Sequence, residues 1–209
     1  MSTLDVSELA QRYDSAAGQW HDKMRLLGYF DAYLGFLSQP NHRPQADALV
    51  IDMGCGTAAM AEAWVAVNGN PKELALVDPS SKMLERGFQT LAARGLTTTR
   101  SIVGFLGETP GLTGYDEVLA AHLIEHCPDP AQTLTELRAL LRPGGLLRLV
   151  VSKPHWCNAI IWFQWRHRTF SRTEIEQLLP NAGFEPLSHY AFPAGPPSRT
   201  SMGFVARAV

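Results

Sequence analysis

The strongest constraint on the fold is an apolar run that ends in an acid and two glycines. Residues 49–57 read Leu-Val-Ile-Asp-Met-Gly-Cys-Gly-Thr, so an apolar strand passes directly into a tight turn. Gly54 and Gly56 lack a Cβ, which lets the main-chain N–H groups of the turn approach a bound molecule. Residues 58–64 then read as a helix. A strand, a glycine turn and a helix predict the first unit of an α/β domain with a nucleotide-type pocket.

Apolar strands and amphipathic helices alternate along the rest of the chain. Ser80 and Asp129 are placed to cap two of the helices, and Ser171 with Glu174 forms a capping box for another. Turns are expected at 142–145 and 193–197. Further strands are expected at 73–78, 97–103, 115–121, 146–151, 184–192 and 201–208. This order predicts a doubly wound α/β fold: a seven-stranded, mostly parallel sheet with a terminal antiparallel strand pair and helices on both faces.

Composition limits the classes of function. A chain of 209 residues with 45% hydrophobic content can bury the core of one globular domain. Its formal charge of −2 and the lack of a basic arm exclude an obvious nucleic-acid partner. Three separated cysteines without a C-x-x-C pair argue against a metal site and a disulfide framework, so we expect a cytoplasmic protein. No apolar run approaches the ~20 residues of a membrane span, and no signal peptide is evident.

Five segments occur in an order that is typical of one enzyme family. They are the D-x-G-x-G turn at 51–57, and the segments 77–80, 115–118, 141–145 and 181–184. In this order they resemble the class I, Rossmann-like methyltransferases that use S-adenosylmethionine (SAM), over roughly residues 48–208. The resemblance implies SAM as cofactor and methyl transfer to an O, N or S atom of a small organic acceptor, for example an aromatic compound or natural product.

Two alternatives remain beside this interpretation. An NAD(P)-dependent oxidoreductase would carry a third glycine near position 59, where Ala59 stands. A non-catalytic SAM-binding partner subunit finds support in an unusual residue, Phe105. The family commonly carries Gly-Asp-Ala after strand three, and the matching residues here are Gly104, Phe105 and Leu106. Adenine is therefore expected to meet the Leu106 backbone N–H and the Phe105 ring.

The resemblance also implies roles for the cofactor residues. Asp78 would accept hydrogen bonds from the ribose hydroxyls, and the alternative for it is a solvated helix cap. Gly54 and Gly56 would admit the methionine portion, while Asp52 would hold the loop or the ligand ammonium. The predicted cofactor-binding residues are Tyr13, Asp52, Gly54, Cys55, Gly56, Asp78, Pro79, Met83, Phe105, Leu106, Ala121 and His122.

Methyl transfer from a sulfonium is an in-line displacement, so the enzyme aligns the nucleophile, excludes water and sometimes removes a proton. His122, which follows strand four, and His155, which follows strand five, are the candidate bases. The alternative for His122 is packing over the SAM methionine. His126 belongs to a Glu-His pair common in the family, for which a structural role is expected.

The acceptor is expected to bind near the ends of strands four and five. An insertion at about 153–170 is rich in aromatic and basic residues, which suits a flat organic substrate. A helix packed on the sheet, with its arginines in solvent, is the alternative. Residues 1–45 are predicted to form a helical lid on a core at 46–209, and the protein to be a monomer or homodimer. The predicted substrate residues are Trp20, His155, Trp156, Trp162, Trp165 and Arg166.

Overall fold

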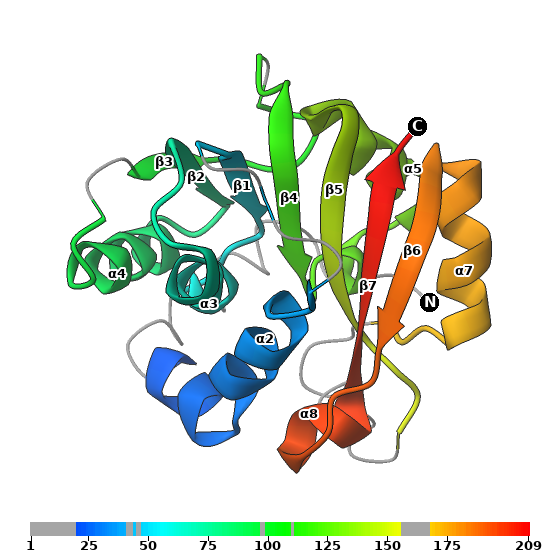
Figure 1. The fold of residues 1–209 in the computed structure, drawn as a ribbon, viewed down its shortest axis with the longest axis horizontal. Coiled ribbons are helices and arrows are strands. Elements are labelled where there is room, and N and C mark those ends of the chain that lie inside the picture. The colour runs from blue at the N-terminus through cyan, green and yellow to red at the C-terminus, as the bar shows by residue number, and fades with distance from the viewer. Residues whose placement is uncertain (1–19, 41–43, 45–46, 97–98, 110, 156–167) are drawn as a thin grey trace.

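The computed structural model describes residues 20–40, 44, 47–96, 99–109, 111–155 and 168–209. Within this part of the chain, seven strands form one sheet (Figure 1). The strands are β1 (Leu49–Met53), β2 (Glu73–Asp78), β3 (Thr99–Val103), β4 (Tyr115–Ala121), β5 (Leu141–Ser152), β6 (Phe184–Tyr190) and β7 (Ser201–Ala208). The helices are α2 (Tyr29–Leu37), α3 (Ala59–Asn68), α4 (Ser81–Ala92), the 3-10 turn η2 (Ile124–His126), α5 (Pro130–Leu140), α7 (Arg172–Asn181) and α8 (Gly195–Thr200).

The sheet has the order β3-β2-β1-β4-β5-β7-β6. Strands β1 to β5 pair in parallel, and β7 runs antiparallel to both β5 and β6. The predicted mostly parallel sheet with a terminal antiparallel pair is therefore confirmed. The strand order reverses between β1 and β4, and ligands of open α/β sheets bind at the carboxyl ends of the strands beside such a reversal.

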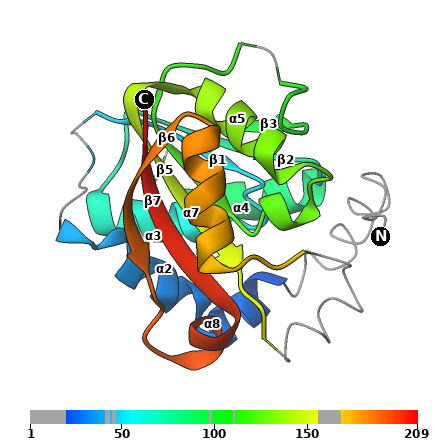
Figure 2. The same ribbon diagram turned by 90° about the vertical axis from the view of Figure 1, so that its right-hand side faces the viewer.

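One hydrophobic cluster on each face holds the helices to the sheet. The first includes α5 and α7, and the second includes α2, α3 and α4 (Figure 2). In β1, Ile51 and Met53 belong to the first cluster and Val50 to the second. Side chains alternate because successive strand residues point to opposite faces. Strand β1 is thus buried on both sides, as is usual for a strand inside a parallel sheet covered by helices.

A buried ion pair accounts for the charge inside the apolar strand β5. Arg148 Nη2 donates to Glu117 Oε1 at 2.9 Å, and Arg148 Nε donates to Oε2 at 3.2 Å. Trp64 Nε1 also donates to Oε2, at 2.8 Å, which links α3 to β4. Arg148 and Glu117 are 0% and 1% exposed. These hydrogen bonds take the place of the water that both charges lose on burial.

The helix starts lie where the sequence predicts them. Ser80 Oγ accepts the Met83 N–H at the start of α4, and Asp129 accepts two backbone N–H groups at the start of α5. Ser171 and Glu174 form the predicted capping box of α7. Short polar side chains at these positions satisfy N–H groups that the first helical turn leaves without partners.

The predicted turn at 142–145 is a bulge in β5, because the strand begins at Leu141 directly after α5. Pairing with β4 shifts from Tyr115 opposite Leu141 to the next described pair, Glu117 opposite Leu146. Residues 142–145 bulge out between these pairs, and Gly144 has a positive φ of 79°. The glycine and proline content of this segment therefore predicted a break in regular structure correctly. Whether the break is a turn or a bulge depended on pairing with β4.

The predicted loop at 193–197 is partly helical. Helix α8 occupies Gly195–Thr200, with prolines in its first turn. Proline is tolerated there because the first N–H groups of a helix have no partner within it. Strand β6 correspondingly ends at Tyr190, two residues before the predicted end.

Across the described ranges, no helix is both long and apolar enough to cross a membrane. In the same part of the chain, no group of three His, Cys, Asp or Glu side chains could hold a metal ion.

Candidate active site at the carboxyl ends of the strands

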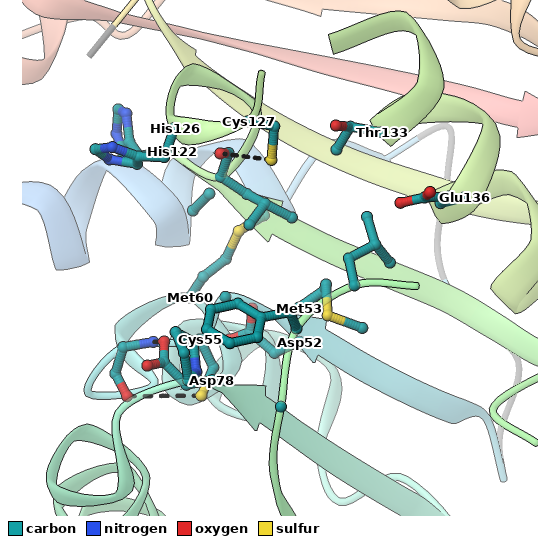
Figure 3. A pocket seen from close by; sticks show the side chains of 18 of the residues that line it. Asp52, Met53, Cys55, Met60, Asp78, His122, His126, Cys127, Thr133 and Glu136 are labelled. Carbon is teal, nitrogen blue, oxygen red and sulfur yellow. Dashed lines mark hydrogen bonds between the residues drawn. The ribbon is translucent and has the colours of Figure 1, made fainter. Parts of the chain in front are cut away.

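A cavity of about 730 Å³ lies at the carboxyl ends of β1, β2 and β4. Figure 3 shows Asp78 and Cys55 on one side of it, His122 and His126 on another, and Thr133 and Glu136 toward α5. Its size is in the range of sites for cofactors and small molecules. The lining includes these residues predicted from the sequence: Trp20, Asp52, Gly54, Cys55, Gly56, Asp78, Pro79, Phe105, Leu106, Ala121 and His122.

The glycine turn brings the backbone to the edge of this cavity. The N–H groups of Gly54 and Cys55 donate to Val77 O at 2.8 and 3.1 Å, which holds the turn against β2. Gly54 and Gly56 have φ values of 69° and 51°, in the left-handed region that favours glycine. A Cβ on Gly54 would also lie 2.9 Å from Leu123 Cδ1, so that side chain would have to shift. A Cβ on Gly56 would meet nothing within 4 Å, so only its backbone conformation favours glycine.

Asp78 sits between the glycine turn and the start of α4. Its Oδ2 accepts the Gly56 N–H at 2.8 Å, and its Oδ1 accepts the Ser80 N–H at 2.9 Å. The carboxylate is 7% exposed and lines the cavity. Ser80, and not Asp78, is the cap of α4. Each carboxylate oxygen has further lone-pair capacity, so the group can also accept the paired hydroxyls of a ribose.

Asp52 is buried at the end of β1, where its Oδ2 accepts the Ala61 N–H of α3 at 3.2 Å. Burial raises the pKa of its carboxyl from 3.8 to about 7, the Ala61 N–H opposes this, and the Asp78 charge adds to it. Burial likewise raises the pKa of the Cys55 thiol well above its ordinary value. The glycine turn thus contains one acid that titrates near neutral pH and one thiol that stays protonated.

We expect the stabilising contribution of Asp52 to fall as the pH rises from about 4 to about 7. The pKa is raised in the folded chain, so the folded state keeps a proton that the unfolded chain releases near pH ~3.9. The contribution is complete below the unfolded pKa and is lost as the pH passes the folded value of about 7. Asp52→Asn stays neutral, so it should gain stability relative to the wild type as the pH rises from about 4 to about 7, and the difference should then stay constant at higher pH. Urea unfolding of both chains tests this, and a stability difference that does not change with pH contradicts it.

The loop after β3 closes the cavity beside Asp78. The Gly104 N–H donates to Asp78 O at 3.2 Å, and Phe105 and Leu106 line the cavity with Glu108. A Cβ on Gly104 would lie 2.9 Å from a methyl group of Thr109, which keeps the loop tight. Phe105 thus places an aromatic ring on the cavity wall, where the resemblance stated above leads one to expect an acid. Glu108 supplies a carboxylate three residues further along the same loop.

His122 leaves β4 in a backbone conformation that few residues adopt. Its φ is 56°, in the left-handed region that costs a non-glycine residue about 1–3 kcal/mol. Its N–H donates to Val150 O at 2.8 Å, so pairing with β5 holds the turn. The imidazole Nδ1 lies 3.0 Å from Glu125 Oε1 and 3.1 Å from Ser152 Oγ. His122 is thus one of three described non-glycine residues with a positive φ, together with Asp47 and Ala58.

Sequence reasoning missed several residues of this cavity. Glu125 lies outside the described lining, and it was seen only as half of the Glu-His pair, although its carboxylate contacts the lining residue His122. Met24 and Tyr33 line the cavity from the N-terminal helices. Asp129, Gln132, Thr133 and Glu136 line it from the start of α5. Their three- and four-residue spacing on one helix face was the available signal.

Some predicted residues lie elsewhere. Met83 is fully buried in α4, and its backbone N–H donates to the Oγ of the helix cap Ser80. Neither Met83 nor His155 is part of the described cavity lining. Tyr13 and four residues of the predicted insertion fall outside the described residues, so their roles stay predictions: Trp156, Trp162, Trp165 and Arg166.

Comparisons with known proteins agree with this architecture. A family model described as a methyltransferase domain matches residues 21–189. A ubiquinone biosynthesis O-methyltransferase of Parvibaculum lavamentivorans is 28% identical over 166 residues, covering 70% of this chain and 62% of the relative. The chain thus spans about three fifths of that relative's length. The protein of the same name from Dinoroseobacter shibae is 26% identical over 226 residues, covering 88% of this chain and 84% of the relative.

A solved structure supports the same fold. The 1,6-didemethyltoxoflavin-N1-methyltransferase of Burkholderia thailandensis, with bound 1,6-didemethyltoxoflavin and S-adenosylhomocysteine, superposes with a TM-score of 0.77 at 20% identity. The superposition covers 100% of this chain and 91% of that one. These matches favour methyl transfer over the NAD(P)-dependent alternative. The family model covers most of the chain, which therefore belongs to the methyltransferase-domain family.

Proposed function

We propose that this enzyme methylates an O, N or S atom of a small organic acceptor, with an aromatic or natural-product acceptor as the best fit. The observation that carries the proposal is the position of His122 on the wall of a mostly apolar cavity that also contains the glycine turn. A flat acceptor would lie against apolar side chains and present its X–H group to the imidazole. The relatives named O-methyltransferases support a hydroxyl as the first acceptor group to test.

We propose S-adenosylmethionine as the cofactor, which would supply an electrophilic methyl group on a sulfonium. We assign the ribose hydroxyls to the Asp78 carboxylate, whose two oxygens are already oriented by the N–H groups of Gly56 and Ser80. The methionine portion would lie along the glycine turn, with its ammonium toward Asp52. Pro79, Phe105 and Leu106 would enclose the adenine. Cys55 and Ala121 complete the proposed cofactor site.

On the acceptor side, Trp20 lines the cavity from the helical segment 20–26. We propose that residues 1–45 act as a lid on the core at 46–209, with Tyr13 over the cofactor. The insertion at about 153–170 would add aromatic and basic groups to the acceptor pocket, and His155 would be a second candidate base. The enzyme would act as a monomer or homodimer, without a nucleic-acid partner.

A screen for release of S-adenosylhomocysteine from SAM would test the acceptor class. Phenols, amines, thiols and carboxylates are offered separately, and we expect turnover with aromatic hydroxyl compounds. Calorimetric titration with SAM and with NAD checks the cofactor side, with binding of SAM alone expected. A chain that binds SAM and methylates no acceptor of the four classes would contradict the proposal.

A further inference from the structure

Glu125 forms a compact hydrogen-bonded cluster around the imidazole of His122. It lies in η2 and is 1% exposed. Its Oε1 accepts the backbone N–H of Ser152 at 2.6 Å and lies 3.0 Å from His122 Nδ1. Ser152 Oγ lies 3.1 Å from the same nitrogen. One buried carboxylate oxygen therefore joins the end of β5 to the candidate base.

The charge of Glu125 determines which ring nitrogen carries the proton. Burial alone would raise the pKa of its carboxyl, but the hydrogen bond and charge of His122, with the Ser152 N–H and His126, hold it below the ordinary value. An ionised carboxylate is an acceptor only, so the Nδ1 atom facing it must be the donor. The neutral imidazole then has its hydrogen on Nδ1 and a lone pair on Nε2.

The other side of the ring is also held. Tyr29 of α2 packs edge-on against the imidazole, with ring centroids 5.6 Å apart. The Tyr29 hydroxyl is itself anchored at 3.0 Å to Thr200 Oγ1. His122 Nε2 is buried, and among the described residues no hydrogen-bond partner meets it. A carboxylate that orients one nitrogen and an unpaired lone pair on the other form the arrangement of a general base, and the bound acceptor must reach the buried Nε2 for the imidazole to act as one.

We infer that Glu125 is a positioning residue, which keeps the proton of His122 on Nδ1 so that Nε2 can accept the proton of the acceptor. This inference rests on the proposed function. The acceptor lone pair forms the new bond to the methyl carbon as the carbon–sulfur bond electrons return to sulfur. The acceptor proton moves to Nε2, and the imidazolium faces the Glu125 charge until it releases the proton to water.

The first test compares Glu125→Gln with two control variants. The amide oxygen can still accept the Ser152 and Nδ1 hydrogens, but the charge is gone. We expect kcat to fall by about 10- to 100-fold with little change in KM for either substrate. Ser152→Ala removes only a neutral contact and should lower kcat by less than about tenfold. Glu185→Gln, in an exposed ion pair with Arg207 far from the cluster in sequence, should leave activity unchanged.

The pH profile separates positioning from mere packing. Without the Glu125 charge, the imidazole protonates at lower pH, so the acid limb of the kcat profile should move to lower pH. Other titratable groups beside the cluster are present in both chains and cancel in the comparison: Tyr29 of α2, which packs on the His122 ring, Tyr33 of α2 and His126 of η2. An acid limb and a kcat that both match the wild type would overturn the inference.

A second measurement needs neither an acceptor nor a variant. Long-range ¹H–¹⁵N spectra of the wild type with ¹⁵N-labelled histidine report which nitrogen of His122 is protonated. We expect the hydrogen on Nδ1 above the titration of the ring, and a hydrogen on Nε2 instead would overturn the inference. If Nδ1 carries the hydrogen but His122→Asn retains full turnover, the proposed base role fails while the tautomer assignment stands.

Discussion

Asp78→Asn should weaken SAM binding by about 100-fold or more while the chain stays folded. The carboxylate accepts two backbone N–H groups, and its remaining lone pairs are assigned to two ribose hydroxyls. An amide has one acceptor oxygen, so its NH₂ group would face one of those backbone donors. The hydrogen bonds to that donor and to one ribose hydroxyl would both be lost. Hydrogen bonds to charged groups contribute about 1.5–3 kcal/mol each, which sets the size of the loss. Calorimetric titration with SAM measures it.

Asp116→Asn is the matched control for this prediction. Asp116 also accepts a backbone N–H, that of Leu49 at 2.7 Å, but it lies at the start of β4 and so at the opposite end of the sheet from the cavity. The Asp116→Asn chain should bind SAM with the same affinity as the wild type. An Asp78→Asn chain that binds SAM as tightly as the wild type would show that the ribose is held elsewhere.

His122→Asn should lower kcat by about 10²- to 10⁴-fold, the usual contribution of a general base, with SAM affinity within a few fold of the wild type. Asparagine is chosen because it tolerates the left-handed backbone of this position better than alanine does. The loss of turnover then reports the imidazole and not a rearranged turn. Single-turnover measurement with a phenolic acceptor gives the rate of the chemical step.

His189→Asn provides the control for histidine loss in general. His189 lies on β6 and packs against the Phe204 ring, with centroids 5.1 Å apart, and the described cavity lining does not include it. It should retain wild-type turnover. If kcat is unchanged in His122→Asn, then His122 only packs beside the cofactor, and methyl transfer is driven by alignment of the reactants alone.

Short-range patterns predicted the sheet and much of its connectivity. The apolar runs indicated the strands, including β1 and β5, and the polar caps located helix starts to the residue. Errors arose where a distant partner decided the local form. The glycine-rich segment 142–145 became a bulge because β4 pairs with β5 on both sides of it. Proline at 196 and 197 suggested a loop, and a short helix formed instead.

The candidate site divides in the same way. Asp52, Gly56 and Asp78 belong to one strand-turn-helix-strand unit, so the sequence alone could place them in one pocket. The partners of His122 could not be found in that way. Ser152 is thirty positions away, and it reaches the ring because Ala121 pairs with Val150 in the parallel sheet.

The sequence by itself determined the alternation of strands and helices, the glycine turn and the carboxylate after β2, because backbone preferences and hydrophobic periodicity act over a few residues. The tertiary structure decided which carboxylate holds the imidazole, how α5 adds Gln132 and Glu136 to the cavity, and how Glu117 neutralises Arg148 inside the sheet. These contacts join distant segments, so their geometry exists only once the strands have paired and the helices have packed on them.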